Sequence, residues 1–140
     1  MAHEYMDVAA AIILREGRIL ITQRPKGSFM AGKWEFPGGK VERGEDPKDA
    51  VAREVFEELK LDVRPKDHFH TTEHVYWLGE NKRTVKLMTY VCEIIKGEMR
   101  RVGCQDLRWV APEELKDFDF VDADVEIVER LAHKYSVAFS

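Results

Sequence analysis

Residues 39–61, GKVERGEDPKDAVAREVFEELKL, carry the strongest structural pattern in the chain. Within them, Asp46 and Pro47 predict a helix start, because aspartate caps helix N-termini and proline fits the first helical position. Apolar residues then recur at helical spacing along one face as far as Leu59. The helix should end near Lys60, because the segment that follows is extended and contains a proline.

Three glutamates occupy a second face of this helix. Glu54, Glu57 and Glu58 stand at i, i+3 and i+4, which brings their carboxylates together. Such a face can simply be solvated, because like-charge neighbours cost only about 0.2–0.5 kcal/mol each. It can also hold Mg²⁺, which binds hard oxygen ligands together with substrate phosphates. The cluster alone does not decide between these interpretations.

The residues around the glutamates favour the metal interpretation. Gly38 and Gly39 form a flexible turn whose backbone can approach a ligand or offer it a carbonyl oxygen. A further acid, Glu45, stands just before the helix. Arg53 lies four residues before Glu57, so its guanidinium can orient a carboxylate.

The whole segment, G-x5-E-x7-R-E-V-F-E-E-L-K-L, resembles the Nudix box G-x5-E-x7-R-E-U-x-E-E-x-G-U, in which U is a bulky aliphatic residue. Only the second glycine of the box is missing, and Lys60 stands in its place. A glycine there would cap the helix in a left-handed conformation that lysine adopts less readily. The segments at 23–25 (QRP), 34–40 (WEFPGGK) and 107–110 (LRWV) resemble the MutT-like branch of the family.

The resemblance implies an α/β (α+β) Nudix fold, in which a mixed β-sheet is sandwiched between α-helices. It also implies a divalent cation, Mg²⁺ or alternatively Mn²⁺. The metal ligands implied are Gly39, through its carbonyl, and Glu54, Glu57 and Glu58, with Glu45 as a supporting acid. Arg53 would orient the catalytic glutamates, of which Glu54 is the first choice for activating the attacking water.

For the MutT-like branch, the implied reaction is hydrolysis of a nucleoside triphosphate to the monophosphate and pyrophosphate. The positions implied for substrate binding are Arg24, Phe36, Lys40, Arg83 and Asp124. Phe36 can also be a core residue. The Asp124 carboxylate would accept a hydrogen bond from an exocyclic amine or, if protonated, donate one to a carbonyl. Oxidised dGTP and a pyrimidine nucleotide such as CTP or dCTP therefore both remain candidates.

One position departs from the MutT-like pattern. Relatives often carry a further glutamate in the loop before the strand that ends in R-W, and that position falls at or beside Gly103. Glu98 and Asp106 are the nearest acids that could substitute. A non-catalytic nucleotide-binding module is therefore an alternative. Hydrolysis of another nucleoside diphosphate derivative such as ADP-ribose is a weaker one, because relatives that act on it commonly have a longer N-terminal region.

Length, charge and composition argue against other classes of protein. The chain has 140 residues and a net charge of -4, which predicts one globular domain over residues 1–140 and argues against binding a nucleic-acid polymer. The apolar run at 8–14 is too short to span a membrane. Cys92 and Cys104 lack a C-x-x-C spacing, which predicts reduced thiols and a cytoplasmic protein. The expected partner is a small-molecule nucleotide, and the oligomeric state is open.

The remaining pattern is mostly strand. A hairpin is predicted over 8–22. The other elements expected are strands at 69–78, 85–95 and 107–110 and helices at 112–115 and 122–135.

The histidines and aromatic residues of the middle strand are expected to be structural. His68 and His70 lack supporting metal ligands, so we expect hydrogen-bonded rather than metal-binding histidines. Phe69, Tyr76 and Trp77 are expected in the sheet core rather than as a platform for stacking bases.

Overall fold

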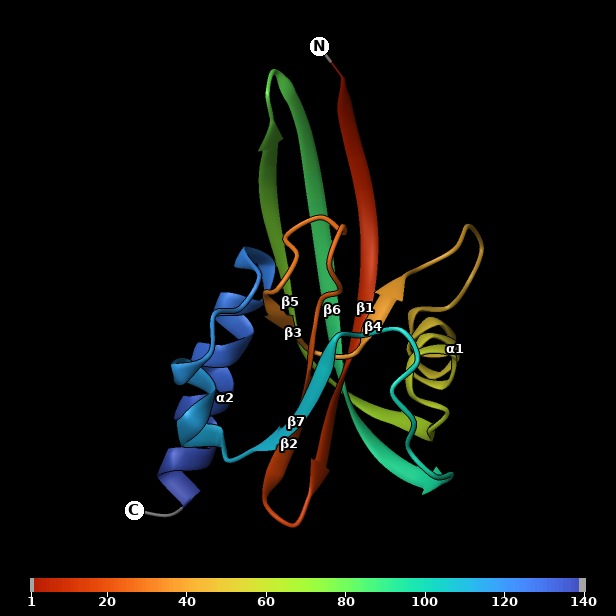
Figure 1. The fold of residues 1–140 in the computed structure, drawn as a ribbon, viewed down its shortest axis with the longest axis vertical. Coiled ribbons are helices and arrows are strands. Elements are labelled where there is room, and N and C mark those ends of the chain that lie inside the picture. The colour runs from red at the N-terminus through yellow and green to blue at the C-terminus, as the bar shows by residue number, and fades with distance from the viewer. Residues whose placement is uncertain (1, 139–140) are drawn as a thin grey trace.

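A mixed sheet forms the centre of the molecule (Figure 1), which a computed structural model describes over residues 2–138. Strand β1 (His3–Arg15) runs parallel to β6 (Asn81–Lys96), and β6 pairs antiparallel with β5 (Asp62–Leu78). The short β4 (Gly38–Lys40) pairs antiparallel with the middle of β1. Gly38 and Gly39 therefore form a strand rather than the predicted flexible turn, because they pair with the buried residues Ala10 and Ala9 of β1.

The end of β1 joins a second group of strands. It pairs with β2 (Arg18–Gln23) through a tight turn, in which Glu16 and Gly17 have φ angles of 50° and 76°. Strand β2 in turn pairs with β3 (Trp34–Glu35) and with β7 (Asp106–Val110). The predicted hairpin is therefore present, and its positive φ angles are those that two-residue hairpin turns require.

Helices cover both faces of the sheet. Helix α1 (Pro47–Leu59) and helix α2 (Val125–Ala138) lie on opposite sides of it (Figure 1). Ala9, Ala11 and Ile13 of β1 belong to the apolar cluster that includes α1. The residues between them, Ala10 and Ile12, belong to the cluster that includes α2. This double burial explains why the start of the chain is apolar at consecutive positions.

Helix α1 begins and ends where the sequence predicts. The Asp46 side chain accepts a hydrogen bond from the Lys48 backbone N–H, and Pro47 occupies the first helical position. At the other end Lys60 adopts the left-handed conformation itself, with φ of 58°, and its N–H donates to the Phe56 carbonyl. Lysine thus takes the conformation that the box glycine would take. The Lys60 Nζ lies 5.3 Å from the centre of the Phe56 ring.

The β5–β6 hairpin is longer than predicted. Strand β5 begins at Asp62 and passes through Pro65, where a shift in register accommodates the missing N–H of proline. The hairpin and the first half of β1 rise beyond both helices (Figure 1). The expectation of a core position for Trp77 is therefore wrong: it is 59% exposed, because α1 does not extend to cover this end of the sheet. Tyr76, on the opposite face, is buried as predicted.

The last predicted helices are partly 3₁₀ in character. Residues Pro112–Asp117 form the 3₁₀ helix η1, and Asp122–Asp124 form η2, which leads directly into α2. The predicted helix at 122–135 therefore starts with a 3₁₀ turn and becomes α-helical at Val125. None of the described helices is long and apolar enough to cross a bilayer.

Candidate active site

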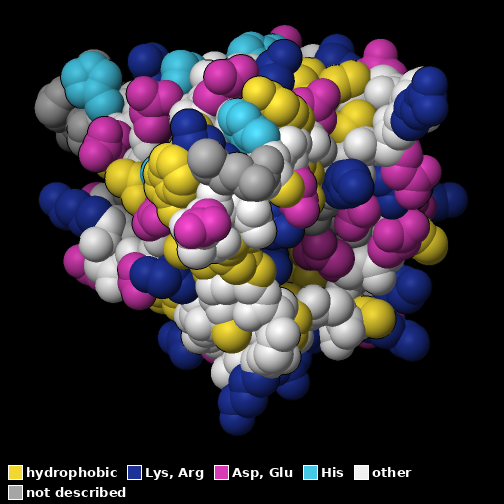
Figure 2. Space-filling view, turned by 90° about the horizontal axis from the view of Figure 1, so that it is seen from above, with side chains coloured by type: hydrophobic (Ala, Val, Ile, Leu, Met, Phe, Trp, Pro, Cys, Tyr) yellow, Lys and Arg dark blue, Asp and Glu magenta, His cyan; other side chains and the backbone are white. Residues whose placement is uncertain are grey.

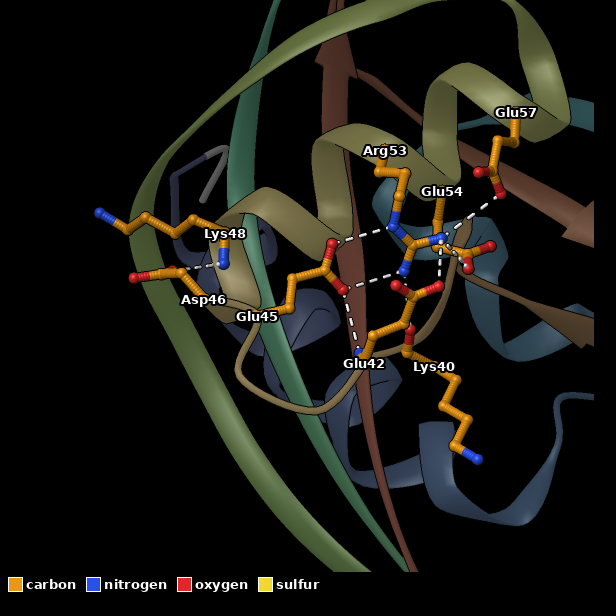
Figure 3. Close-up of polar contacts among 8 residues, drawn as sticks. All are labelled: Lys40, Glu42, Glu45, Asp46, Lys48, Arg53, Glu54 and Glu57. Atoms are coloured by element: carbon orange, nitrogen blue, oxygen red, sulfur yellow. Dashed lines mark hydrogen bonds and ion pairs between the residues drawn. The ribbon is translucent and has the colours of Figure 1, made fainter.

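Arg53 lies at the centre of the carboxylate cluster (Figure 3). Its Nε and Nη2 donate to the two carboxylate oxygens of Glu45, at 2.9 and 3.0 Å. Its Nη1 donates to Glu54 at 2.9 Å and to Glu57 at 3.4 Å. Its Nη2 also donates to the Lys40 carbonyl at 3.0 Å, which ties α1 to the end of β4. These are the contacts expected of a residue that orients carboxylates.

Glu45 forms an ion pair with this arginine. Both of its carboxylate oxygens accept from Arg53, and one also accepts from the Glu42 backbone N–H. The hydrogen bond from Arg53, followed by that from Glu42, lowers the pKa of Glu45 to about 2. This geometry fits a supporting acid better than a direct ligand.

Glu54 lies directly against the backbone of Gly39. A Cβ atom at position 39 would collide with the Glu54 carboxyl group, so any larger residue there would displace that side chain. Burial raises the pKa of Glu54, while the hydrogen bond from Arg53 acts in the opposite direction. The structure therefore brings together a backbone segment and a side chain that were predicted as ligands of one cation.

Glu58 faces inward from α1, whereas Glu57 points outward and is largely exposed. The pKa of Glu58 is raised to about 8, first by burial and then by the neighbouring charges of Glu35 and Glu54. Seen from above, acidic side chains gather on the side of the molecule that carries α1, beside a hollow in the surface (Figure 2).

The donors in this region fit Mg²⁺ or Mn²⁺ in chemical type. Carboxylate and carbonyl oxygens are the hard ligands that these cations prefer, and a cation would offset the repulsion between the glutamates. Within residues 2–138, no three Asp, Glu, His or Cys side chains are gathered tightly enough to define a complete metal site.

A cavity of about 390 Å³ adjoins the carboxylates. All five residues predicted for substrate binding line it: Arg24, Phe36, Lys40, Arg83 and Asp124. Gly39 and Glu58 line it as well, whereas Glu45, Glu54 and Glu57 are not among its lining residues. The fold thus connects the predicted nucleotide-binding residues, which come from separate elements, to one edge of the carboxylate cluster.

Phe36 and Asp124 form the buried part of this cavity. Phe36 is 2% exposed and stacks on Phe120 with ring centroids 5.3 Å apart, so it is at once a core residue and a lining residue. Its backbone N–H donates to Asp124 Oδ2 at 3.1 Å. Burial, reinforced by the charge of Glu35, holds the pKa of Asp124 well above its usual range.

Glu35 is a site residue that the sequence pattern does not predict. It lies between two buried aromatic residues and lines the cavity, where Arg24 Nη1 donates to its two carboxylate oxygens at 3.2 and 3.1 Å. Burial raises the pKa of Glu35, and the charge of Arg24 opposes this effect. The sequence feature that points to Glu35 is its position between two aromatic residues in the run Trp34-Glu35-Phe36. Burying a carboxylate is costly unless a partner or a ligand compensates for the lost hydration.

Arg83 and Gly103 also line the cavity. Arg83 Nε donates to Glu4 at 3.0 Å, and its guanidinium lies 5.5 Å from the Phe29 ring centre. A Cβ at Gly103 would come within 3.3 Å of the Glu58 Cγ, so this position does face the carboxylate helix. Glu98 and Asp106, proposed as substitutes for the missing acid, are not among the lining residues of the cavity.

Comparison with known proteins shows the family. The NUDIX domain profile matches residues 4–131. The CTP pyrophosphohydrolase of Escherichia coli K12 is 34% identical over 124 residues, covering 89% of each chain. The 8-oxo-dGTP diphosphatase of the same organism is 32% identical over 127 residues, covering 90% of this chain and 95% of the relative.

A solved structure agrees with these matches. The crystal structure of the MutT protein from Methanosarcina mazei Go1 has a TM-score of 0.81 and 27% identity, covering 96% of this chain and 98% of that one. The chain therefore belongs to the Nudix family. Its similarity to MutT-like proteins confirms the branch predicted from the residues flanking the box, and the predicted fold is confirmed with it.

Proposed function

We propose that this protein hydrolyses nucleoside triphosphates to the monophosphate and pyrophosphate, with Mg²⁺ as the cation and Mn²⁺ as an alternative. The observation that carries the proposal is that one cavity joins the predicted nucleotide-binding residues to Gly39 and Glu58. The two relatives named CTP pyrophosphohydrolase and 8-oxo-dGTP diphosphatase support it.

Gly39, Glu54, Glu57 and Glu58 would hold the cation. When bound, a divalent cation offsets negative charge on the phosphate oxygens and eases deprotonation of the attacking water. Arg53 contributes by fixing Glu54, to which it donates at 2.9 Å. Glu54 is thereby held in one orientation, and we assign it the proton from the attacking water.

Basic side chains around the cavity would bind the phosphates and the ribose. Arg24, Lys40 and Arg83 all line it, and guanidinium groups suit paired phosphate oxygens. Arg24 and Arg83 are already ion-paired, with Glu35 and Glu4. These carboxylates fix the guanidinium groups before a ligand arrives.

Asp124 and Phe36 would recognise the base. Asp124 Oδ2 already accepts from the Phe36 N–H, so the other oxygen is the atom that can face a ligand. In its neutral form, that carboxyl group can donate to a base carbonyl, and in its ionised form it can accept from an exocyclic amine. An oxidised guanine and a cytosine both present such groups, so we propose 8-oxo-dGTP and CTP or dCTP as the substrates to compare first.

A product assay tests the proposal. The purified chain, with Mg²⁺, is incubated with normal dNTPs, 8-oxo-dGTP, CTP and ADP-ribose, and the monophosphate and pyrophosphate are measured. We expect turnover that is lost in Glu54→Gln and Glu58→Gln and retained in Glu80→Gln, an exposed residue of the β5–β6 turn.

The residue at position 103, a glycine, supports one alternative function. Because no acid stands there, a protein that binds nucleotides without hydrolysing them is the second candidate. Tight binding of several nucleotides with no product would favour this candidate over the hydrolase.

A further inference from the structure

Two side chains of strand β5 hydrogen-bond the backbone of η2, one to the N–H and one to the carbonyl of Ala123. Tyr76 Oη accepts from the Ala123 N–H at 2.8 Å, and Thr72 Oγ1 donates to the Ala123 carbonyl at 3.2 Å. Thr72 and Tyr76 are 9% and 8% exposed, so these hydrogen bonds are shielded from water. The peptide groups on both sides of Ala123 are therefore fixed by two side chains of a distant strand.

Two histidines on the same face of β5 extend this contact. His70 Nε2 lies 2.7 Å from Glu126 Oε2 at the start of α2. His74 Nε2 lies 3.8 Å from Asp122 Oδ2 at the start of η2. Alternate residues of a strand point to one face, so every second residue from 70 to 76 contacts the segment 122–126.

The residue after Ala123 is Asp124. Its side chain is buried at the cavity, where it accepts from the Phe36 N–H. Its own backbone N–H donates to the Val121 carbonyl at 3.0 Å, within a 3₁₀ helix of only 3 residues. So short a helix does not hold its backbone by itself, and the hydrogen bonds to Ala123 supply that constraint.

We propose that Thr72 and Tyr76 are positioning residues for base recognition: by holding Ala123 they set the position of the Asp124 carboxyl group, and with it the selectivity among nucleobases. The inference rests on the proposed function, in which Asp124 contacts the base. Thr72 is the sharper of the two probes, because Tyr76 lines the cavity itself and Thr72 does not.

The test compares how tightly different nucleoside monophosphates bind. Dissociation constants for CMP, dGMP and 8-oxo-dGMP are measured by calorimetry, with Mg²⁺, for the wild type, Thr72→Val and Tyr76→Phe. We expect the ratio of the dissociation constants of the weakest and the tightest ligand to fall about threefold to tenfold in each variant. This is the factor that corresponds to one net hydrogen bond. Binding is measured independently of turnover, so the outcome stands even if the hydrolase proposal fails.

Matched controls separate positioning from general damage. Thr71→Val removes a hydroxyl from the next residue of β5, where it hydrogen-bonds His68 instead of η2. Tyr90→Phe removes a phenol hydroxyl from the cluster on the α1 side. Neither should change the ratio. Thr72→Ser keeps the hydroxyl donor, so we expect it to keep the wild-type ratio.

A double-mutant cycle shows whether the effect passes through Asp124. In an Asp124→Ala background, Thr72→Val should leave the ratio unchanged, because there is no carboxyl group left to misplace. The inference is wrong if Thr72→Val changes the ratio equally in both backgrounds, if it leaves the wild-type ratio intact, or if the wild type does not discriminate among the bases. If Thr72→Val does not fold, Tyr76→Phe in the same cycle decides the question.

Discussion

The backbone of Gly39 touches the carboxyl group of Glu54, leaving no room for a Cβ atom between them. This contact ties strand β4 to helix α1 at the place where the sequence predicts a cation. It also distinguishes Gly39 from its neighbour Gly38, where a Cβ would collide with the backbone of β1 instead.

Gly39→Ala should therefore reduce activity without unfolding the protein. The added methyl group displaces a flexible side chain, and a displacement of about 1 Å in a catalytic group can cost on the order of 100-fold in rate. We expect kcat to fall about 100-fold, with the melting temperature nearly unchanged. Gly38→Ala should instead lower the melting temperature, because backbone atoms of Ala9 and Ala10 stand in the way. Equal losses of stability in the two variants would contradict this distinction.

Gly103→Glu should increase the rate of hydrolysis. The position lines the cavity and lies against Glu58, so a longer acidic side chain there can add a second proton acceptor to the one proposed at Glu54. A positioned general base commonly contributes about 100-fold or more, and we expect at least a tenfold rise in kcat with Mg²⁺. Gly103→Gln is the matched control, since it has the same size without a proton acceptor. Identical rates in the two variants would mean that the hydrolase does not lack a base at this position.

Lys60→Gly should stabilise the fold. Lys60 has a left-handed conformation with φ of 58°, which costs a non-glycine residue roughly 1–2 kcal/mol. Part of that gain is offset by losing the amine above the Phe56 ring, so we expect an increase of about 1 kcal/mol in the free energy of unfolding, measured by urea denaturation. Lys60→Ala loses the amine but keeps the strained conformation. If the alanine variant is as stable as the glycine variant, the left-handed strain is not the cause.

Asp124→Asn should change how stability depends on pH. Burial raises the pKa of Asp124 well above 3.8, so the folded state favours the neutral carboxyl group. The stability that this group contributes is complete below its unfolded pKa, and it is lost as the pH rises through the folded pKa. Asparagine stays neutral and keeps an oxygen that can accept from the Phe36 N–H.

Urea denaturation of both proteins between pH 4 and pH 8 measures the effect. The asparagine variant should gain stability relative to the wild type as the pH rises, and the difference should be smallest near pH 4. A difference that does not vary with pH would show that Asp124 is ionised in the fold at every pH tested.

Local sequence patterns were sufficient to predict the parts of the site that lie close together in the sequence. Asp46, Pro47 and the repeated apolar residues predicted α1 correctly, because capping and helical spacing act over a few residues. The same spacing put the glutamates and Arg53 within reach of one another, and the structure shows these contacts.

Longer-range features were harder to predict. Glu35 was missed, because its pairing with Arg24 depends on the antiparallel contact between β2 and β3. The strand pattern predicts a core position for Trp77, because an aromatic residue in a strand is usually covered, but the length of the hairpin relative to α1 leaves it exposed.

The sequence by itself determined the helix, its N-cap, the order of the carboxylates and the family, since each of these follows from residues at fixed short spacings. The resemblance implied which distant residues bind substrate, but only the tertiary structure shows that they share one cavity. Arg24, Phe36, Arg83 and Asp124 come from different elements, and the sheet brings them to one cavity beside Glu58. The tertiary structure also raised the pKa of Asp124, because only the complete fold removes this carboxyl group from water.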